Sequence, residues 1–66
     1  MLQPHQQRVV AEHIALSDKI YSLEQFIPTD RFSSLDRAEK SRMRRQCAAM
    51  NAYADVLAER IAAFPA

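Results

Sequence analysis

The chain has 66 residues, with no glycine or tryptophan, one cysteine and a formal net charge of +1. Chains of this size bury only about 60% of the surface that their unfolded form exposes, so they usually need disulfides, a metal or oligomerisation. The single Cys47 excludes an internal disulfide, and together with His5 and His13 it matches no zinc-ligand spacing. Oligomerisation remains, and we expect one small domain, residues 1–66, that assembles with copies of itself.

The amino-terminal segment, residues 1–8, lacks the apolar core of a signal peptide. No segment of the chain reaches the roughly 18 uncharged residues of a membrane span. We therefore expect a cytosolic protein without membrane contact, and a single thiol fits a reducing compartment. The near-neutral net charge argues against a general nucleic-acid binder, so we expect no DNA partner.

The first predicted helix spans residues 4–27, because proline is well tolerated in a first helical turn and Pro28 disfavours helical geometry at the preceding residue. Its apolar residues alternate spacings of four and three, which keeps side chains on one seam between packed helices. This seam consists of Val9, His13, Leu16, Ile20, Leu23 and Ile27, and it is widened by Val10, Ile14 and Tyr21. A stripe this wide suits a helical bundle better than a two-stranded coiled coil.

The second predicted helix spans residues 34–64, with Ser33 as a possible cap, Asp36 three residues later, and Pro65 as the stop. Its predicted seam consists of Met43, Gln46, Met50, Tyr53, Leu57, Arg60 and Phe64. A charge at a seam position such as Arg60 must find a carboxylate, water or a bound anion.

Two such helices predict an all-α fold, a two-helix antiparallel hairpin that assembles into a symmetric helical homo-oligomer. At 1.5 Å per residue the helices are about 35 and 45 Å long, so the end of the second helix should protrude. Leu57, Ile61 and Phe64 would then lack a partner in their own chain. Since exposed apolar stripes mark interaction surfaces, we expect these ends to interlock between copies.

Residues 37–45 form a basic run, with five positive side chains against one negative. Arg37, Lys40 and Arg44 stand three and four apart and share one helix face, which could hold phosphate through the planar fork of arginine. The alternative is a solvated surface in which Asp36 and Glu39 pair locally with Lys40.

The sequence shows no catalytic constellation, so we expect no enzyme activity, no catalytic residue, no metal site and no cofactor. Ser33 and Ser34 lack a base at a meaningful spacing, and no carboxylate pair lies on an apolar background. Aromatic side chains could stack on a base or pack in the core. Core packing is favoured for Phe26 and Tyr53, whereas Phe32 fits either role.

Two stretches carry a resemblance to a known family. They are His5-Gln6-Gln7-Arg8-Val9-Val10 and the run Arg45-Gln46, Met50, Tyr53, Leu57, Arg60-Ile61. With these, and with seam residues from Gln3 to Phe64, the chain resembles the helical hairpin domain of small tailed-phage proteins. That domain is shared by anti-CBASS and anti-Thoeris sponges, which sequester the nucleotide second messengers of bacterial antiviral signalling.

The resemblance implies a phage immune-evasion protein in the cytoplasm of the infected bacterial host. It implies a multi-subunit helical assembly, hexameric in relatives, that encloses cyclic di- or trinucleotides between subunits without cleaving them. The ligand-binding residues that it implies are Arg8, Arg45 and Arg60 for phosphates, Thr29 and Phe32 in the loop, and Tyr21 for stacking on a base. Two other interpretations stay open, a small oligomeric phage protein-interaction module with no nucleotide ligand, and weak nucleic-acid binding through the basic run.

Overall fold

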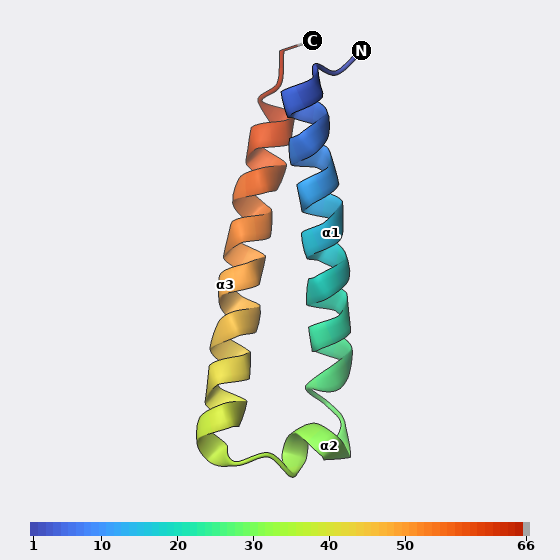
Figure 1. Cartoon of the computed structure of the whole chain (residues 1–66). Helices are drawn as coiled ribbons and strands as arrows, with labels where there is room; N and C mark the ends of the chain where they lie inside the picture. Colours follow the sequence, from blue (N-terminus) through green and yellow to red (C-terminus); the bar gives the residue numbers. More distant parts are fainter. Residues whose placement is uncertain (66) are drawn as a thin grey trace.

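The computed structural model describes residues 1–65, which form three helices, α1 (Pro4–Phe26), α2 (Asp30–Ser33) and α3 (Arg37–Ala62). The two long helices lie side by side and antiparallel, α2 lies in the connection between them, and both termini lie at the opposite end (Figure 1). The molecule is a rod with extents of 48 × 14 × 14 Å. The predicted all-α hairpin is confirmed.

The first helix begins and ends close to its predicted bounds. Pro4 occupies the first helical turn, where its missing N–H is not needed for an intrahelical bond. The side-chain Oε1 of Gln6 accepts a hydrogen bond from the backbone N–H of Gln3 at 2.8 Å, which satisfies one of the free donors at this end. The helix ends at Phe26, one residue before the predicted bound, because Pro28 prevents its continuation.

The connection contains a helical turn that the sequence analysis did not predict. Thr29 caps this turn, since its Oγ1 accepts from the backbone N–H of Phe32 at 3.2 Å. Ser33 therefore belongs to α2, and its predicted role as the cap of the long second helix is wrong. That cap is Asp36, whose carboxylate accepts from the N–H of Glu39 at 2.7 Å, so α3 begins three residues later than predicted. An ionised acceptor at the positive end of a long helix outcompetes a hydroxyl.

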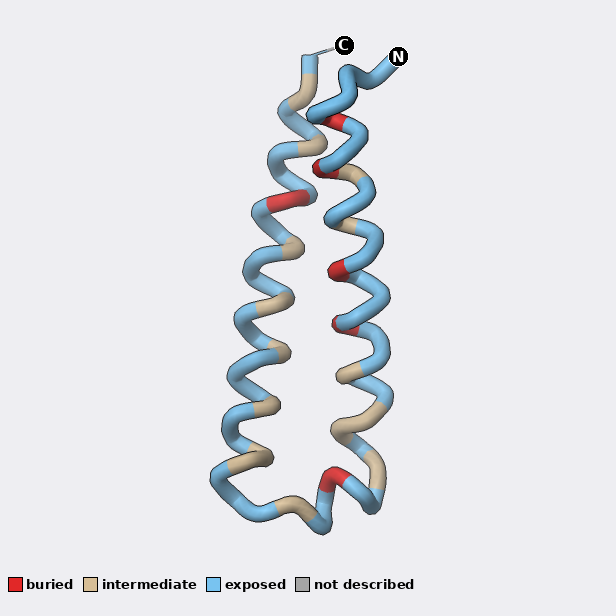
Figure 2. The backbone as a smooth tube through the Cα atoms, viewed as in Figure 1, coloured by how far each residue is buried: buried red, intermediate tan, exposed pale blue. Residues whose placement is uncertain are grey.

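The core lies along the line of contact between α1 and α3, where buried positions recur on α1 and half-buried positions, with the buried Leu57, recur on α3 (Figure 2). Val9, Leu16 and Ile20 of α1 are buried, and the other positions of the predicted α1 seam are half-buried. The spacing of apolar residues in the first helix thus identified the face that packs. The predicted widening of this seam by Ile14 and Tyr21 is wrong, because both side chains are exposed.

The seam of α3 was predicted only in part. Its buried and half-buried residues are Met43, Cys47, Met50, Ala54, Leu57, Ile61 and Phe64. The predicted seam included Gln46, Tyr53 and Arg60, which are exposed, and the residue that follows each of these three faces inward instead. Both stripes have the same alternation of three and four, so the spacing could not separate them. Burial of small and apolar side chains wins because burying an amide or a guanidinium costs desolvation free energy.

The predicted protrusion of the second helix is also wrong. Leu57 is 1% exposed within its own hairpin, and Ile61 and Phe64 pack against the same core. α3 has 26 residues and α1 has 23, so the helices are about 39 and 35 Å long. The connection, residues 27–36, is longer than predicted, so residues of α3 lie opposite other residues of α1 than expected. The two long helices end at the same level near the termini (Figure 1).

Candidate functional site

The six residues predicted to contact a ligand are spread along the rod rather than gathered at one place. Arg8 lies in the second turn of α1 and Arg60 in the last turn of α3, so both lie near the termini. Thr29 and Phe32 lie at the other end of the rod, in and beside α2. The rod is 48 Å long, so one subunit presents these residues as separate groups.

The end that holds the termini presents unpaired positive charge. Arg8 and Arg60 are both exposed. Among residues 1–65 the single salt bridge joins Arg42 to Glu39, so neither of the two arginines is paired with a carboxylate of this part of the chain. The predicted placement of Arg60 on the seam is wrong, because its side chain is exposed to solvent.

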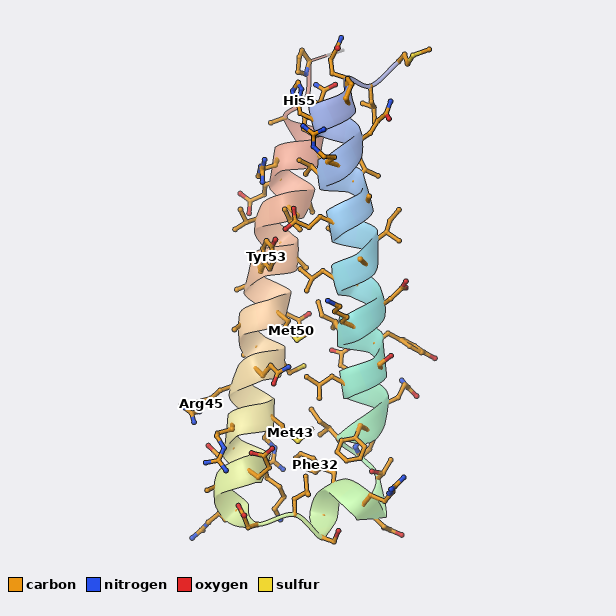
Figure 3. The ribbon with its side chains drawn as sticks, viewed as in Figure 1. His5, Phe32, Met43, Arg45, Met50 and Tyr53 are labelled. Carbon is orange, nitrogen blue, oxygen red and sulfur yellow. The ribbon has the colours of Figure 1, made fainter. Side chains whose placement is uncertain are left out.

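At the end of the rod that holds the connection, Thr29 and Phe32 join α2 to the end of α1. The Thr29 hydroxyl donates to the carbonyl of Phe26 at 2.6 Å and accepts from the N–H of Phe32 at 3.2 Å. The Phe32 ring is 2% exposed and packs edge-on against Phe26, with 6.0 Å between centroids and 90° between planes. Figure 3 shows it between the lower ends of the long helices. These contacts build the turn, and the ligand contacts expected of both residues stay predictions.

Three cations of the basic run are committed to contacts at this end. The Arg44 guanidinium lies 5.1 Å from the centroid of the Phe32 ring, within cation–π range. The Lys40 ammonium donates to the carbonyl of Ser33 at 3.3 Å. The Arg42 side chain bridges to Glu39 at 2.8 Å. Glu39 therefore pairs with Arg42 and not with Lys40, the partner expected on a solvated surface.

The other two cations of the run are exposed. Arg37 opens α3, and Arg45 extends from the side of that helix away from α1 (Figure 3). Arginine keeps its charge at any physiological pH and offers a planar set of donors to phosphate. The basic run is thus a mixture, in which Lys40 and Arg44 contact α2, Arg42 pairs within α3, and Arg37 and Arg45 remain available.

The aromatic residues divide in a similar way. Phe26 packs against Phe32, as expected for a core residue. Tyr53 is 45% exposed, so its predicted core role is wrong, and Tyr21 is 65% exposed (Figure 3 shows Tyr53). Both tyrosines can stack on a flat partner. Sequence analysis missed the exposure of Tyr53 because it lies one residue before a true seam position.

Residues 1–65 enclose no pocket, and they hold no group of three metal-binding side chains. No helix in this part of the chain is long and apolar enough to cross a bilayer.

Comparison with protein families matches residues 3–63 to the family described as Sequestin. The match covers nearly the whole hairpin, from the turn that opens α1 to the residue that ends α3. No curated protein and no solved structure matches the chain.

Proposed function

The chain belongs to the Sequestin family, and from this membership we propose that it binds and sequesters cyclic oligonucleotide second messengers of bacterial antiviral signalling without cleaving them. The family name, Sequestin, is consistent with sequestering a ligand, and it agrees with the resemblance of the sequence to phage anti-CBASS sponges. The protein would act in the cytoplasm of an infected bacterium, where it would protect the phage.

The observation that carries this proposal is a set of exposed arginines that form no salt bridge within residues 1–65. Arg8, Arg45 and Arg60 are exposed, and none takes part in the salt bridge found among residues 1–65. Every nucleotide of a cyclic oligonucleotide carries a phosphate, and arginine binds paired phosphate oxygens with two parallel hydrogen bonds. Exposed tyrosines supply flat surfaces for the bases.

The dispersed placement of these residues favours a ligand site between subunits. Arg8 and Arg60 lie at one end of a 48 Å rod, and Thr29 and Phe32 lie at the other. A cyclic dinucleotide is much shorter than the rod, so no single copy could reach it with both groups. In a homo-oligomer, a hexamer as the family resemblance implies, the ends of neighbouring copies would meet around one ligand.

Sequestration needs no chemistry. A protein present above the concentration of the messenger, and with a dissociation constant below it, lowers the free messenger by mass action alone. The ligand stays intact, which accords with the expectation that the protein is not an enzyme.

A protein-interaction module without a nucleotide ligand is the second candidate. The observation that favours it is the exposure of large apolar side chains, with Ile14 58% and Val56 53% exposed. Such side chains serve protein contacts better than phosphate contacts.

The two candidates are separated by a depletion experiment. The protein is incubated with cyclic di- and trinucleotides, and free nucleotide is measured by chromatography after ultrafiltration, with linear dinucleotides and ATP as controls. We expect stoichiometric loss of the free cyclic species and full recovery of intact ligand after heat denaturation of the protein. Undiminished free ligand would favour the interaction module, and recovery of linear products would reveal an enzyme.

A further inference from the structure

A second stripe of regularly spaced residues runs along α3 on the side away from α1. Its members alternate spacings of three and four, the geometry of a seam between packed helices. We call it the outer stripe, and it consists of Arg42, Arg45, Ala49, Ala52, Val56 and Glu59. All six residues are exposed, and Arg45 extends away from α1 in Figure 3.

Helix geometry separates this stripe from the core. Ala52 lies two residues after the half-buried Met50, and so about 200° around the helix from it. No contact with α1 in the same chain can cover such a face. The middle of the stripe is small, with two alanines, and small side chains let two helix axes approach closely.

Reflection of the stripe about its midpoint pairs small residues at the centre, Arg45 with Val56 further out, and opposite charges at the ends. Counting outward from the midpoint between Met50 and Asn51, Ala49 mirrors Ala52. Further out, Arg42 mirrors Glu59. When two copies of α3 pack antiparallel along this stripe, Ala49 of one copy therefore lies opposite Ala52 of the other. Arg42 of each copy then lies opposite Glu59 of the other.

We propose that two copies of this protein pack α3 against α3, antiparallel, along the outer stripe. Arg42 of each copy then lies opposite the partner's Glu59, at both ends of a seam with alanines at its centre. The interface is self-complementary, as a two-fold symmetric dimer requires. The proposal goes beyond the proposed function and does not depend on a nucleotide.

Charge complementarity fixes the orientation. Residues 37–45 carry five positive and one negative side chain, whereas residues 46–62 carry one positive and two negative. Parallel packing would set Arg42 against Arg42 and Glu59 against Glu59, and facing like charges oppose association. Antiparallel packing sets the basic half of each α3 against the acidic half of the other.

The salt bridge of Arg42 and the long side chain of Arg45 are both compatible with this seam. Arg42 already bridges to Glu39 of its own helix at 2.8 Å, and a guanidinium has enough donors to bind a second carboxylate. The aliphatic stem of Arg45 would pack beside the partner's Val56 while its charged head reaches solvent at the edge of the seam. Arg45 thus remains available to an anion.

The hairpin exposes more surface than a compact domain of its mass. The chain exposes 5118 Å², whereas a compact monomer of 7.6 kDa exposes about 4,300 Å². The excess of roughly 800 Å² leaves surface that a second copy can cover. The radius of gyration, 15.2 Å against about 11 Å for a compact domain of this length, reflects the same elongation.

The mass of the assembly tests the seam. We compare the wild type with Ala52→Glu by analytical ultracentrifugation, using Ala58→Glu as the matched control, since Ala58 is exposed on the same helix about 120° away from Ala52. We expect Ala52→Glu to lower the mass to half of the wild-type value or less, and Ala58→Glu to keep it. Helical circular dichroism will confirm that both variants fold. A monomeric wild type, or an unchanged mass for Ala52→Glu, would overturn the proposal.

Charge reversal tests the register. Glu59→Arg should weaken association at least tenfold, and Arg42→Glu added to it should restore most of the loss. A double variant that stays as dissociated as Glu59→Arg alone would overturn the pairing of these two residues.

A mixed disulfide tests the orientation. In a Cys47→Ala background, Arg45→Cys and Val56→Cys proteins are mixed and oxidised, and the products are identified by mass spectrometry. Antiparallel packing predicts that the 45–56 mixed disulfide dominates. Predominance of the two symmetric disulfides would show parallel packing and overturn the proposal.

Discussion

The inward and outward sides of α3 have the same spacing of seam residues but different chemistry. The inward side presents apolar and small residues and includes Leu57, which is 1% exposed, whereas the outward side combines alanines with Arg42 and Glu59. A periodic pattern on a helix therefore identifies faces that can pack, but the cost of burying charge decides which face packs within the chain. The other face remains for a second molecule.

The largest expected effect is a difference in the free energy of unfolding between variants of Leu57, on the inward side, and its neighbour Val56, on the outward side. Leu57→Ala should lower the free energy of unfolding by about 2 to 5 kcal/mol, because it leaves a cavity in the core. Val56→Ala, in dilute protein, should lower it by less than about 1 kcal/mol, since Val56 is 53% exposed. Urea denaturation measures both. Equal losses in the two variants would contradict the assignment of the inward side.

The next largest effect concerns the binding of a nucleotide by the exposed Arg60. Arg60→Ala should weaken the binding of a cyclic dinucleotide by about 1.5 to 3 kcal/mol, the range for hydrogen bonds to charged groups. Lys19→Ala is the control, because Lys19 is an exposed cation outside the predicted set. Isothermal titration calorimetry gives both affinities. Equal affinity in the two variants would remove Arg60 from the site.

A smaller effect sharpens the point where α3 begins. Asp36→Ala should cost about 0.5 to 2 kcal/mol of stability, because it removes the acceptor for the N–H of Glu39. Ser33→Ala should cost less than about 0.5 kcal/mol, since Ser33 does not cap α3. Thermal unfolding followed by circular dichroism compares the two. The reverse order would restore Ser33 as the cap.

The smallest effect lies within the basic run. Arg44→Ala should lower stability by about 0.5 to 1 kcal/mol through loss of the contact with the Phe32 ring. Arg37→Ala should leave stability nearly unchanged, because Arg37 is exposed and takes no part in the salt bridge of residues 1–65. Chemical denaturation of both variants tests the division. A larger loss for Arg37→Ala would contradict it.

Much of the fold was predictable from local rules. Pro4 and Pro28 bound α1, and the spacing from Val9 to Ile27 identified its packing face, since that row of residues is the longer of the two apolar rows on the helix. The second helix offered two stripes with equal spacing, and the sequence analysis selected positions from both. Arg60 was placed on the seam because its spacing fits, although burying its guanidinium would cost more desolvation free energy than burying Ile61.

The length of the connection was less predictable. Thr29 caps the short helix α2 and Asp36 caps α3, so the connection contains a helical turn that the apolar pattern does not predict. That turn shifted the pairing of the helices and buried Leu57, which the sequence analysis had left exposed. The candidate ligand residues were predictable only as a set of exposed cations and aromatics. Their grouping depends on how copies assemble, and the sequence analysis did not separate the outer stripe of α3 from its inward seam.

Native mass spectrometry of the full chain tests the central claim most directly, that cyclic oligonucleotides are held between copies. The protein is sprayed with cyclic di- and trinucleotides, and with linear dinucleotides and ATP as controls. We expect intact cyclic ligand at a fixed ratio to subunits on an oligomer, and none on the monomer. An oligomer that retains no cyclic nucleotide, or a monomer that binds it alone, would contradict the account.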